Sequence, residues 1–260
     1  MVSQNTQTES LFNRYAKTLR KDRWWLEPLL VGVGLFIFVM YSTVSAALLG
    51  NYWPYEIGPY VSPFFEPLFY TDILPKWVSP AIFILWAPLS FRMTCYYYRR
   101  AYYRSYFLSP PACAVQEPAD SYSGESTVPL VVQNIHRFSM YGALIFVPIL
   151  WNGAIRSFYW DGEIGIGIGS VLLLINAFLL SGYTFGCHSF RHLIGGGLNS
   201  FTGSKYQLFR KKIWNIVTVI NSHHKYWAWS SLIVVGLSDL YVHMVASEWI
   251  TDINTWNSFF

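Results

Sequence analysis

Three cysteines and five of the six histidines fall at a common depth along the hydrophobic segments of this chain, close to the ends of those segments. Thiolate sulfur and imidazole nitrogen are protein ligands of zinc, haem iron and iron–sulfur clusters. An apolar helix bundle has no folding reason to gather such side chains at one level, so the grouping indicates a metal or redox site. The residues concerned are Cys95, Cys113, Cys187, His136, His188, His192, His223 and His224.

The motif GCHSFRH (186–192) places His188 and His192 four residues apart, hence on one face of a helix, with Cys187 beside them. Such a pair binds one metal, or one histidine ligates while its neighbour forms a hydrogen bond. For any single residue there is a plainer interpretation: a lone cysteine in a membrane helix is a small apolar side chain, and a lone interfacial histidine is solvated. Three cysteines facing a reducing cytoplasm argue against disulfides.

The other two cysteines stand in different settings. In FRMTCYYYRRAYYR (91–104), Cys95 is one turn from Arg92 and Arg99, and nearby cations favour the thiolate that a metal requires. The tyrosines and arginines of this segment are also typical of a membrane–water interface. Cys113 lies in SPPACAV (109–115), a proline-stiffened loop that is suited to a cluster ligand or serves only as a connecting turn.

Asp239 is an ionisable residue well inside the last hydrophobic segment. Charged groups in hydrocarbon are costly, so a carboxyl at this depth favours a functional role, such as relaying protons or contacting the head of a quinone. The alternative is an internal hydrogen bond to His243, one turn further along, or to Asn176 in the preceding segment. Asp239 is therefore our candidate catalytic residue.

Hydropathy predicts the elements that position these residues. Five segments approach the roughly 20 apolar residues that cross a hydrocarbon core of about 30 Å, and in lipid they must be helical. Charged residues form 12% of the chain and aromatic residues 19%, a balance that is rare in soluble domains. We expect an all-α integral membrane protein with a single domain, 1–260. The predicted spans are 28–50, 77–97, 129–151, 164–187 and 226–248.

Lysine and arginine residues gather on one side of these spans. The N-terminal flank carries five, the 92–128 segment four and the stretch between spans 4 and 5 six, whereas the opposite segments hold only Lys76 and Arg156. By the positive-inside rule, the N-terminus is cytoplasmic and the C-terminus external. The expected parts are a cytoplasmic segment without a cleavable signal peptide, a five-helix bundle and an external tail, at 1–27, 28–250 and 251–260.

The segment KYQLFRKKIWNIVTVI (205–220), between spans 4 and 5, is amphipathic. Five apolar residues form one stripe, with three cations opposite: Phe209, Ile213, Ile216, Val217 and Ile220 against Arg210, Lys211 and Lys212. We expect this segment to lie on the inner membrane interface or to dock a soluble partner. The chain has no internal repeat, no P-loop and no nucleic-acid signature, so no nucleic-acid partner is expected.

Two redox centres are compatible with this set of residues. A b-haem needs two axial histidines facing each other, and His136, His188, His192 or His224 could supply them. The first two spans contain no histidine, which argues against the di-haem five-helix anchors of fumarate reductases. Three cysteines beside several histidines fit a mixed Cys/His iron–sulfur cluster of the Rieske kind better. A non-redox transporter or scaffold, favoured by Asp239 alone, is a further alternative.

Five motifs together resemble the membrane-anchor (cytochrome-b-like) subunit of actinobacterial-type succinate dehydrogenases. They are FRMTCYYYRRAYYR, SPPACAV, NIHR, CHSFRH and NSHHKYWAW. The resemblance implies a haem-free chain with a membrane-embedded Rieske-type [2Fe–2S] cluster. Its ligands would be two cysteines from Cys95, Cys113 and Cys187, and two histidines from His136, His188, His192 and His224. The spacing differs from the C-x-H…C-x-x-H of soluble Rieske proteins, so it does not select the four.

The resemblance also implies partners and a place in metabolism. A flavoprotein and an iron–sulfur subunit would dock on the cytoplasmic face, and electrons from succinate would pass through this chain to a quinone, expected to be menaquinone. The chain would thus be a multi-pass subunit in the bacterial inner membrane, in contact with lipid and serving the respiratory chain and the tricarboxylic acid cycle. It would contain no complete active site for succinate oxidation, and the complex could form a higher oligomer.

Overall fold

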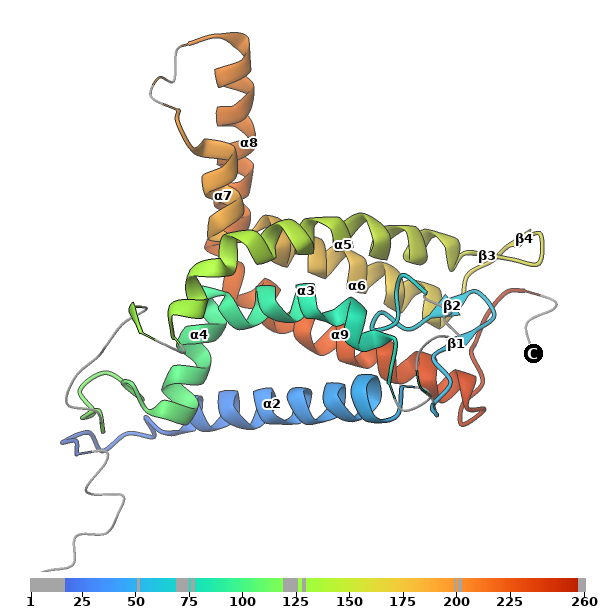
Figure 1. The fold of residues 1–260 in the computed structure, drawn as a ribbon, viewed down its shortest axis with the longest axis horizontal. Helices are drawn as coiled ribbons and strands as arrows, with labels where there is room; N and C mark the ends of the chain where they lie inside the picture. The colour runs from blue at the N-terminus through green and yellow to red at the C-terminus, as the bar shows by residue number, and fades with distance from the viewer. Residues whose placement is uncertain are drawn as a thin grey trace, which may run out of the picture.

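A computed structural model of the chain shows an all-helical bundle with two short β-hairpins at one end (Figure 1). We call that end the hairpin end, and the opposite end, where Cys95 and Cys187 lie, the cysteine end. The described residues are 17–50, 52–68, 75, 78–118, 126–127, 130–198, 200 and 203–256.

Among the described residues, four helical segments are long and apolar enough to cross a membrane. The first joins α2 (Leu26–Ser42) to a π-helical continuation (Thr43–Leu48), and the second runs from Val131 through α5 (His136–Arg156). The others are α6 (Ile168–Phe185) and α9 (His224–Ala246). Many of their large apolar side chains point outward and are exposed, as expected of helices that have hydrocarbon as their solvent. A multi-pass membrane protein was therefore correctly predicted from composition and hydropathy.

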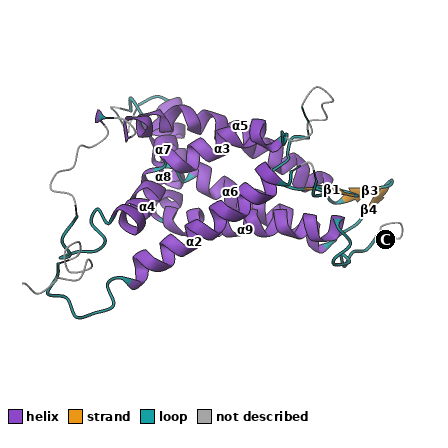
Figure 2. Cartoon of the chain, turned by 60° about the horizontal axis from the view of Figure 1, so that its bottom comes forward, coloured by secondary structure: helices purple, strands orange, loops and turns teal. Residues whose placement is uncertain are grey.

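The predicted second span, 77–97, is a shorter helix in the structure. Helix α3 (Ala81–Thr94) has 14 residues and runs beside α5 (Figures 1 and 2). It stops at Cys95, whose backbone is extended (ψ 130°), and α4 (Tyr96–Tyr102) and a π-helical turn (Tyr103–Phe107) then turn towards α2. Hydropathy missed this break because residues 95–97 remain apolar or aromatic.

Small residues allow the bundle helices to approach closely. A Cβ atom built on Gly142 of α5 would lie 3.0 Å from the Cβ of Ala87 in α3. One on Gly182 of α6 would overlap the ring of Trp227 in α9. The core at the cysteine end therefore brings α3, α5, α6 and α9 together around buried Phe91, Met140, Tyr183 and Ala228.

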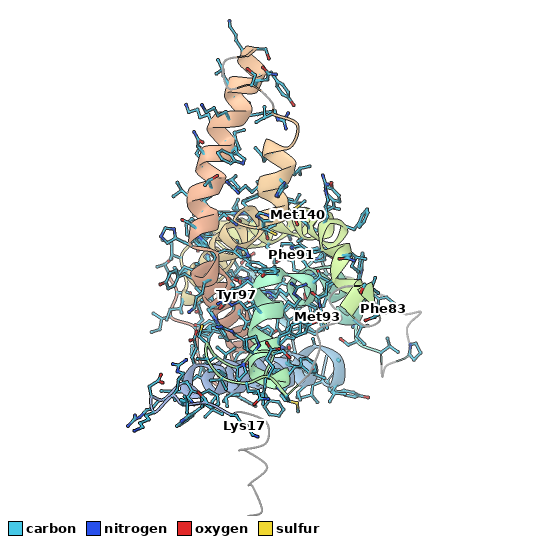
Figure 3. All side chains as sticks on the ribbon, turned by 90° about the vertical axis from the view of Figure 1, so that its left-hand side faces the viewer. Lys17, Phe83, Phe91, Met93, Tyr97 and Met140 are labelled. Atoms are coloured by element: carbon cyan, nitrogen blue, oxygen red, sulfur yellow. The ribbon has the colours of Figure 1, made fainter. Side chains whose placement is uncertain are left out.

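Helices α7 (His188–Gly195) and α8 (Lys205–Ser222) form a helical hairpin that projects from the cysteine end, across the direction of the bundle helices (Figures 1 and 3). Ser204 caps α8: its hydroxyl accepts from the backbone N–H of Gln207, whose side chain accepts from the backbone N–H of Ser204. A short 3₁₀ segment (Leu130–Ile135) precedes α5.

The hairpin end is closed by β1 (Glu56–Ile57) paired with β2 (Tyr60–Val61), and by β3 (Tyr159–Trp160) paired with β4 (Glu163–Ile164). The C-terminal segment returns to this end. There the buried carboxylate of Asp252 accepts hydrogen bonds from Tyr60 Oη (2.8 Å), Tyr241 Oη (2.5 Å) and the backbone N–H of Gly169 (3.2 Å). Asp252 thereby ties the tail to β2, α6 and α9.

Candidate functional site

Cys95 and Cys187 occupy equivalent breaks between helices. Each has an extended backbone, with ψ of 130° and 142°, and each immediately precedes a short helix that leaves the bundle. Both side chains are 2% exposed. The break at Cys187 depends on the preceding Gly186, because a Cβ atom on residue 186 would lie 2.7 Å from the carbonyl oxygen of Gly182. The two thiols are thus held at fixed turning points of the backbone.

A histidine from a neighbouring helix meets each cysteine. His136, the first residue of α5, places Nε2 3.1 Å from the sulfur of Cys187. His224, the first residue of α9, places Nε2 3.6 Å from the sulfur of Cys95. We expected His136 about two turns inside a span; it lies five residues into the apolar helical stretch Val131–Arg156, at the point where the 3₁₀ segment becomes α5.

An aromatic ring stacks on each imidazole, and His136 also has a polar contact. His136 stacks on Phe91 at 4.9 Å, and its Nδ1 lies 2.9 Å from the hydroxyl of Thr94. His224 stacks on Tyr183 at 5.1 Å. Partners on the second ring nitrogen are typical of ligating histidines, because they set the tautomer and the ring orientation.

The two Cys–His pairs belong to one buried core. The rings of Phe91 and Tyr183, which stack on the two histidines, contact each other edge to face at 5.3 Å. Arg92 lies over the Tyr183 ring at 4.7 Å and donates to Tyr98 and Ser231. Figure 3, which looks at the cysteine end, shows Phe91 in this core. The arrangement gathers two thiols and two imidazoles at one place, beside a guanidinium.

The chemistry of these donors suits a cluster better than a single ion. Within the described ranges, no three His, Cys, Asp or Glu side chains come close enough together to hold one metal ion. Two thiols and two imidazoles could instead share a group with two metal atoms, two donors to each. Two buried polar atoms of this core, Tyr183 Oη and His224 Nδ1, have no hydrogen-bond partner among the described residues. His224 Nδ1 lies on the side of the ring away from Nε2, the nitrogen that faces Cys95, so only Tyr183 leaves a hydroxyl in the core that could donate to a bound group.

Three of the predicted ligands lie elsewhere. Cys113 is exposed and lies in a loop, where its backbone carbonyl accepts a hydrogen bond from Arg20 Nη1 at 2.8 Å. His188 and His192 share a helix face, as their spacing predicted, and their Nε2 atoms lie 3.1 Å apart. That face is exposed, however, and it does not contribute to the buried core that holds Cys95 and Cys187. His223 is also exposed.

A second polar site surrounds Asp239 towards the hairpin end. Its side chain is fully buried and accepts hydrogen bonds from Tyr41 Oη (2.6 Å), Ser45 Oγ (2.7 Å) and Ser62 Oγ. His243 Nε2 lies 3.3 Å from the same carboxylate. The Asp–His contact was one of the predicted alternatives. Asn176, the other predicted partner, does not contact Asp239: its Oδ1 has no partner in the described part of the chain.

Ser45 links Asp239 to His243. Its hydroxyl lies 2.7 Å from Asp239 Oδ2 and 3.1 Å from His243 Nε2. His243 Nδ1 lies 2.7 Å from the carbonyl of Pro54 and donates to it, so Nε2 of the neutral ring is an acceptor. Because Ser45 donates its one proton to Asp239, the carboxylate and His243 Nε2, 3.3 Å apart, can hold one further proton between them. Sequence reasoning missed Tyr41, Ser45 and Ser62, although a serine within the first span is a weak polar signal.

The two sites lie at opposite ends of α9. His224 and Asp239 are 15 residues apart, which corresponds to about 22 Å at the rise of an α-helix. The chain thus combines a sulfur- and nitrogen-rich site at one end with a carboxylate site that can hold protons towards the other.

Comparison with known proteins agrees with this architecture. Residues 26–248 match the family described as actinobacterial succinate dehydrogenase subunit SdhC. The chain is similar to a chain of the solved Mycobacterium smegmatis Sdh1 complex in the apo form, with a TM-score of 0.83, 40% sequence identity, and coverage of 92% of this chain and 94% of that chain. No curated protein sequence matches. The family match runs from the first residue of α2 to beyond the end of α9 and confirms the resemblance to a membrane anchor. This chain therefore belongs to the family of actinobacterial succinate dehydrogenase SdhC subunits.

Proposed function

We propose that this subunit carries electrons from the soluble subunits of succinate dehydrogenase to a membrane quinone, using a Rieske-type [2Fe–2S] cluster held by Cys95, Cys187, His136 and His224. The observation that carries the proposal is the meeting of these two Cys–His pairs in one buried core. A bound cluster of this kind exchanges single electrons, and its histidine ligands raise its reduction potential.

The side chains around the four donors hold them in place and exclude water. Thr94 orients His136 through Nδ1, and the ring of Tyr183 supports His224. Both cysteines are almost completely buried. Rigid, dry surroundings are what an electron carrier needs, because they keep its geometry the same in both redox states.

In this proposal α3 is a fifth membrane-spanning element. It has only 14 residues, and the chain completes the span through the turn at Cys95. The N-terminus and the cysteine end face the cytoplasm, and a flavoprotein and an iron–sulfur subunit dock there, on the inner face of the bacterial inner membrane. The distribution of Lys and Arg supports this orientation. Cations cluster at the cysteine end, at Arg99, Arg100, Arg104, Lys205, Lys211 and Lys212.

Asp239 acts at the other end. Quinone reduction consumes protons, and the carboxyl group of Asp239 either relays them from the outer side through His243 and Ser45 or, when protonated, donates a hydrogen bond to a quinone carbonyl. The hydroxyl donors Tyr41 and Ser62 hold the carboxylate in position. The expected quinone is menaquinone.

The test is metal, sulfide and EPR analysis of the purified complex, with single serine variants of the three cysteines. Cys95→Ser and Cys187→Ser should each remove the EPR signal of a histidine-ligated [2Fe–2S] cluster, together with the corresponding iron and acid-labile sulfide. Cys113→Ser is the matched control and should retain both, since Cys113 is exposed and distant from the site. Stoichiometric haem b in the preparation, or an unchanged cluster in all three variants, would contradict the proposal.

A further inference from the structure

The α7–α8 hairpin is a rigid unit that extends sideways from the bundle. Arg191 of α7 donates to the hydroxyl of Thr218 at 3.0 Å and lies over the Trp214 ring at 4.5 Å. Arg210 of α8 donates to the carbonyls of Ile194 (2.9 Å) and Gly196 (2.6 Å). With 18 residues, α8 is about 27 Å long, so most of it lies beyond the bundle (Figure 1).

One face of α8 carries an apolar stripe, which we define as Phe209, Ile213, Ile216 and Ile220. The intervals of four, three and four residues put these side chains in one row. The contact of Ile220, the last residue of the stripe, shows which way the stripe faces. A Cβ on Gly186, at the end of α6, would lie 3.0 Å from Ile220 Cγ2. The stripe therefore faces the side of the hairpin on which the bundle helices lie.

Further out along α8, the stripe loses its contact with the bundle. Phe209 is 60% exposed and Ile216 is 55% exposed, so no described residue covers them. Val217, which we assigned to the stripe from the sequence, is buried instead. On the opposite face are Lys211 and Asn215, while Lys205 and Lys212 flank one edge of the stripe, with exposed Leu208 and Val219 beyond them around the helix.

We infer that α8 lies flat on the inner surface of the bilayer, with the stripe at the boundary between head groups and acyl chains and with Lys205 and Lys212 at anionic head groups. The spans of the bundle are surrounded by lipid, and the stripe faces the same side as those spans. A soluble partner cannot reach that side without entering the bilayer. Apolar residues towards the acyl chains, with lysines at the edge, are the pattern of an interfacial helix.

This inference does not depend on the cluster or on Asp239; it uses the membrane-spanning bundle and the contacts of α8, and only the assignment to the inner surface rests on the orientation in the proposed function. The opposite face of α8 is left to water or to the soluble subunits. The hairpin would thus widen the footprint of the subunit on the membrane and keep the cysteine end at a constant depth.

The test places a genetically encoded fluorescent amino acid at Phe209 or Ile216 and, as the matched control, at Asn215, in the intact complex reconstituted into nanodiscs. Acyl-chain-brominated lipid should quench the probes at 209 and 216 severalfold more than the probe at 215. Aqueous iodide should show the reverse order. Equal quenching at all three sites, or probes at 209 and 216 that neither quencher reaches, would overturn the inference, the second result by indicating a protein partner.

A second arm examines the head groups. In nanodiscs of phosphatidylcholine alone, the quenching of the 216 probe by brominated lipid should fall relative to discs that contain phosphatidylglycerol. In the variant K205Q/K212Q, quenching of the 216 probe should be the same in both kinds of nanodisc, because the edge of the stripe then carries neither of these two lysines. If the difference persists in the variant, these lysines do not contact anionic lipid and that part of the inference is wrong.

Discussion

The imidazole Nε2 of His136 lies 3.1 Å from the sulfur of Cys187, although the two residues are 51 positions apart in the chain. Both stand at helix starts, His136 at the first residue of α5 and Cys187 directly before α7. A helix start fixes the position of the Cα atom, and stacking on Phe91 fixes the ring. This contact is therefore set by the fold and not by a flexible side chain.

We expect His136→Ala to abolish the [2Fe–2S] EPR signal and succinate:quinone activity, while succinate oxidation with a soluble artificial acceptor continues. The reason is that His136 is one of four donors in the buried core. His188→Ala and His192→Ala are the controls, because both residues are exposed and pair only with each other. A signal lost to the same extent in either control would show that the ligands lie on α7.

Thr94→Val should weaken the proposed cluster without removing a ligand. The hydroxyl of Thr94 lies 2.9 Å from His136 Nδ1, and loss of such an outer partner costs about 10–100-fold in metal affinity. The measurement is the rate at which a chelator removes iron from the complex. Thr94→Ser keeps the hydroxyl and should behave like the parent protein; a faster loss of iron from the serine variant would mean that packing of the methyl group is responsible.

Asp239→Asn should slow quinone reduction by about 10²-fold, the usual effect of losing a proton-transfer group, while succinate oxidation by an artificial acceptor stays near normal. The amide is nearly the same size as the carboxyl, but it cannot exchange a proton through Ser45. Equal loss of both activities would indicate that Asp239 only holds the bundle together. Asp252→Asn, at the same end, is the control for such a structural effect, because Asp252 connects three elements of the fold.

Glu66, in the segment before α3, should make stability depend on pH. Burial raises its pKa from 4.5 to about 7, and Arg156 only partly opposes the shift. Because the folded state then holds the proton more tightly than the unfolded state, stability is greatest below pH 4.5 and falls as the pH rises towards 7. The loss is about 1–3 kcal/mol.

Glu66→Gln should flatten this dependence, since glutamine stays neutral over the whole range. The measurement is the thermal unfolding midpoint of the detergent-solubilised complex between pH 5 and pH 8. Glu56→Gln is a suitable control on the same side of the bundle, because Glu56 is an exposed residue of β1. A parent complex whose midpoint rises from pH 5 to pH 8, with the same rise in Glu66→Gln, would contradict the predicted role of Glu66.

Much of the fold follows from hydropathy, because a bilayer imposes both the length and the helical form of a span. The first and last spans were predicted within two residues of their observed ends, at 26–48 and 224–246. Errors occur where the backbone breaks within an apolar stretch. The end of α3 at Thr94 and the start of α5 at His136 depend on packing and local hydrogen bonds, which hydropathy does not report.

The residue types of the candidate site could be predicted from the sequence, but not which particular residues form it. The crowding of cysteines and histidines pointed to the end of the bundle where the structure pairs Cys95 with His224 and Cys187 with His136, yet the spacing of His188 and His192 favoured a pair that the structure exposes. Their helical spacing places them on one face, but only the course of α7 decides where that face points. Likewise, Asp239 was visible in the sequence, whereas Ser62 comes from a loop with no sequence signal connecting it to α9.

The four donors are distributed along the whole chain, and this order has a consequence for biogenesis. Cys95, His136 and Cys187 enter the membrane with the earlier helices, but His224 begins the last one. The donor set is therefore incomplete until α9 has been synthesised and inserted. In the proposed assignment, the cluster can be completed only after α9 has been inserted, and a chain that ends before His224 would lack one of the four donors.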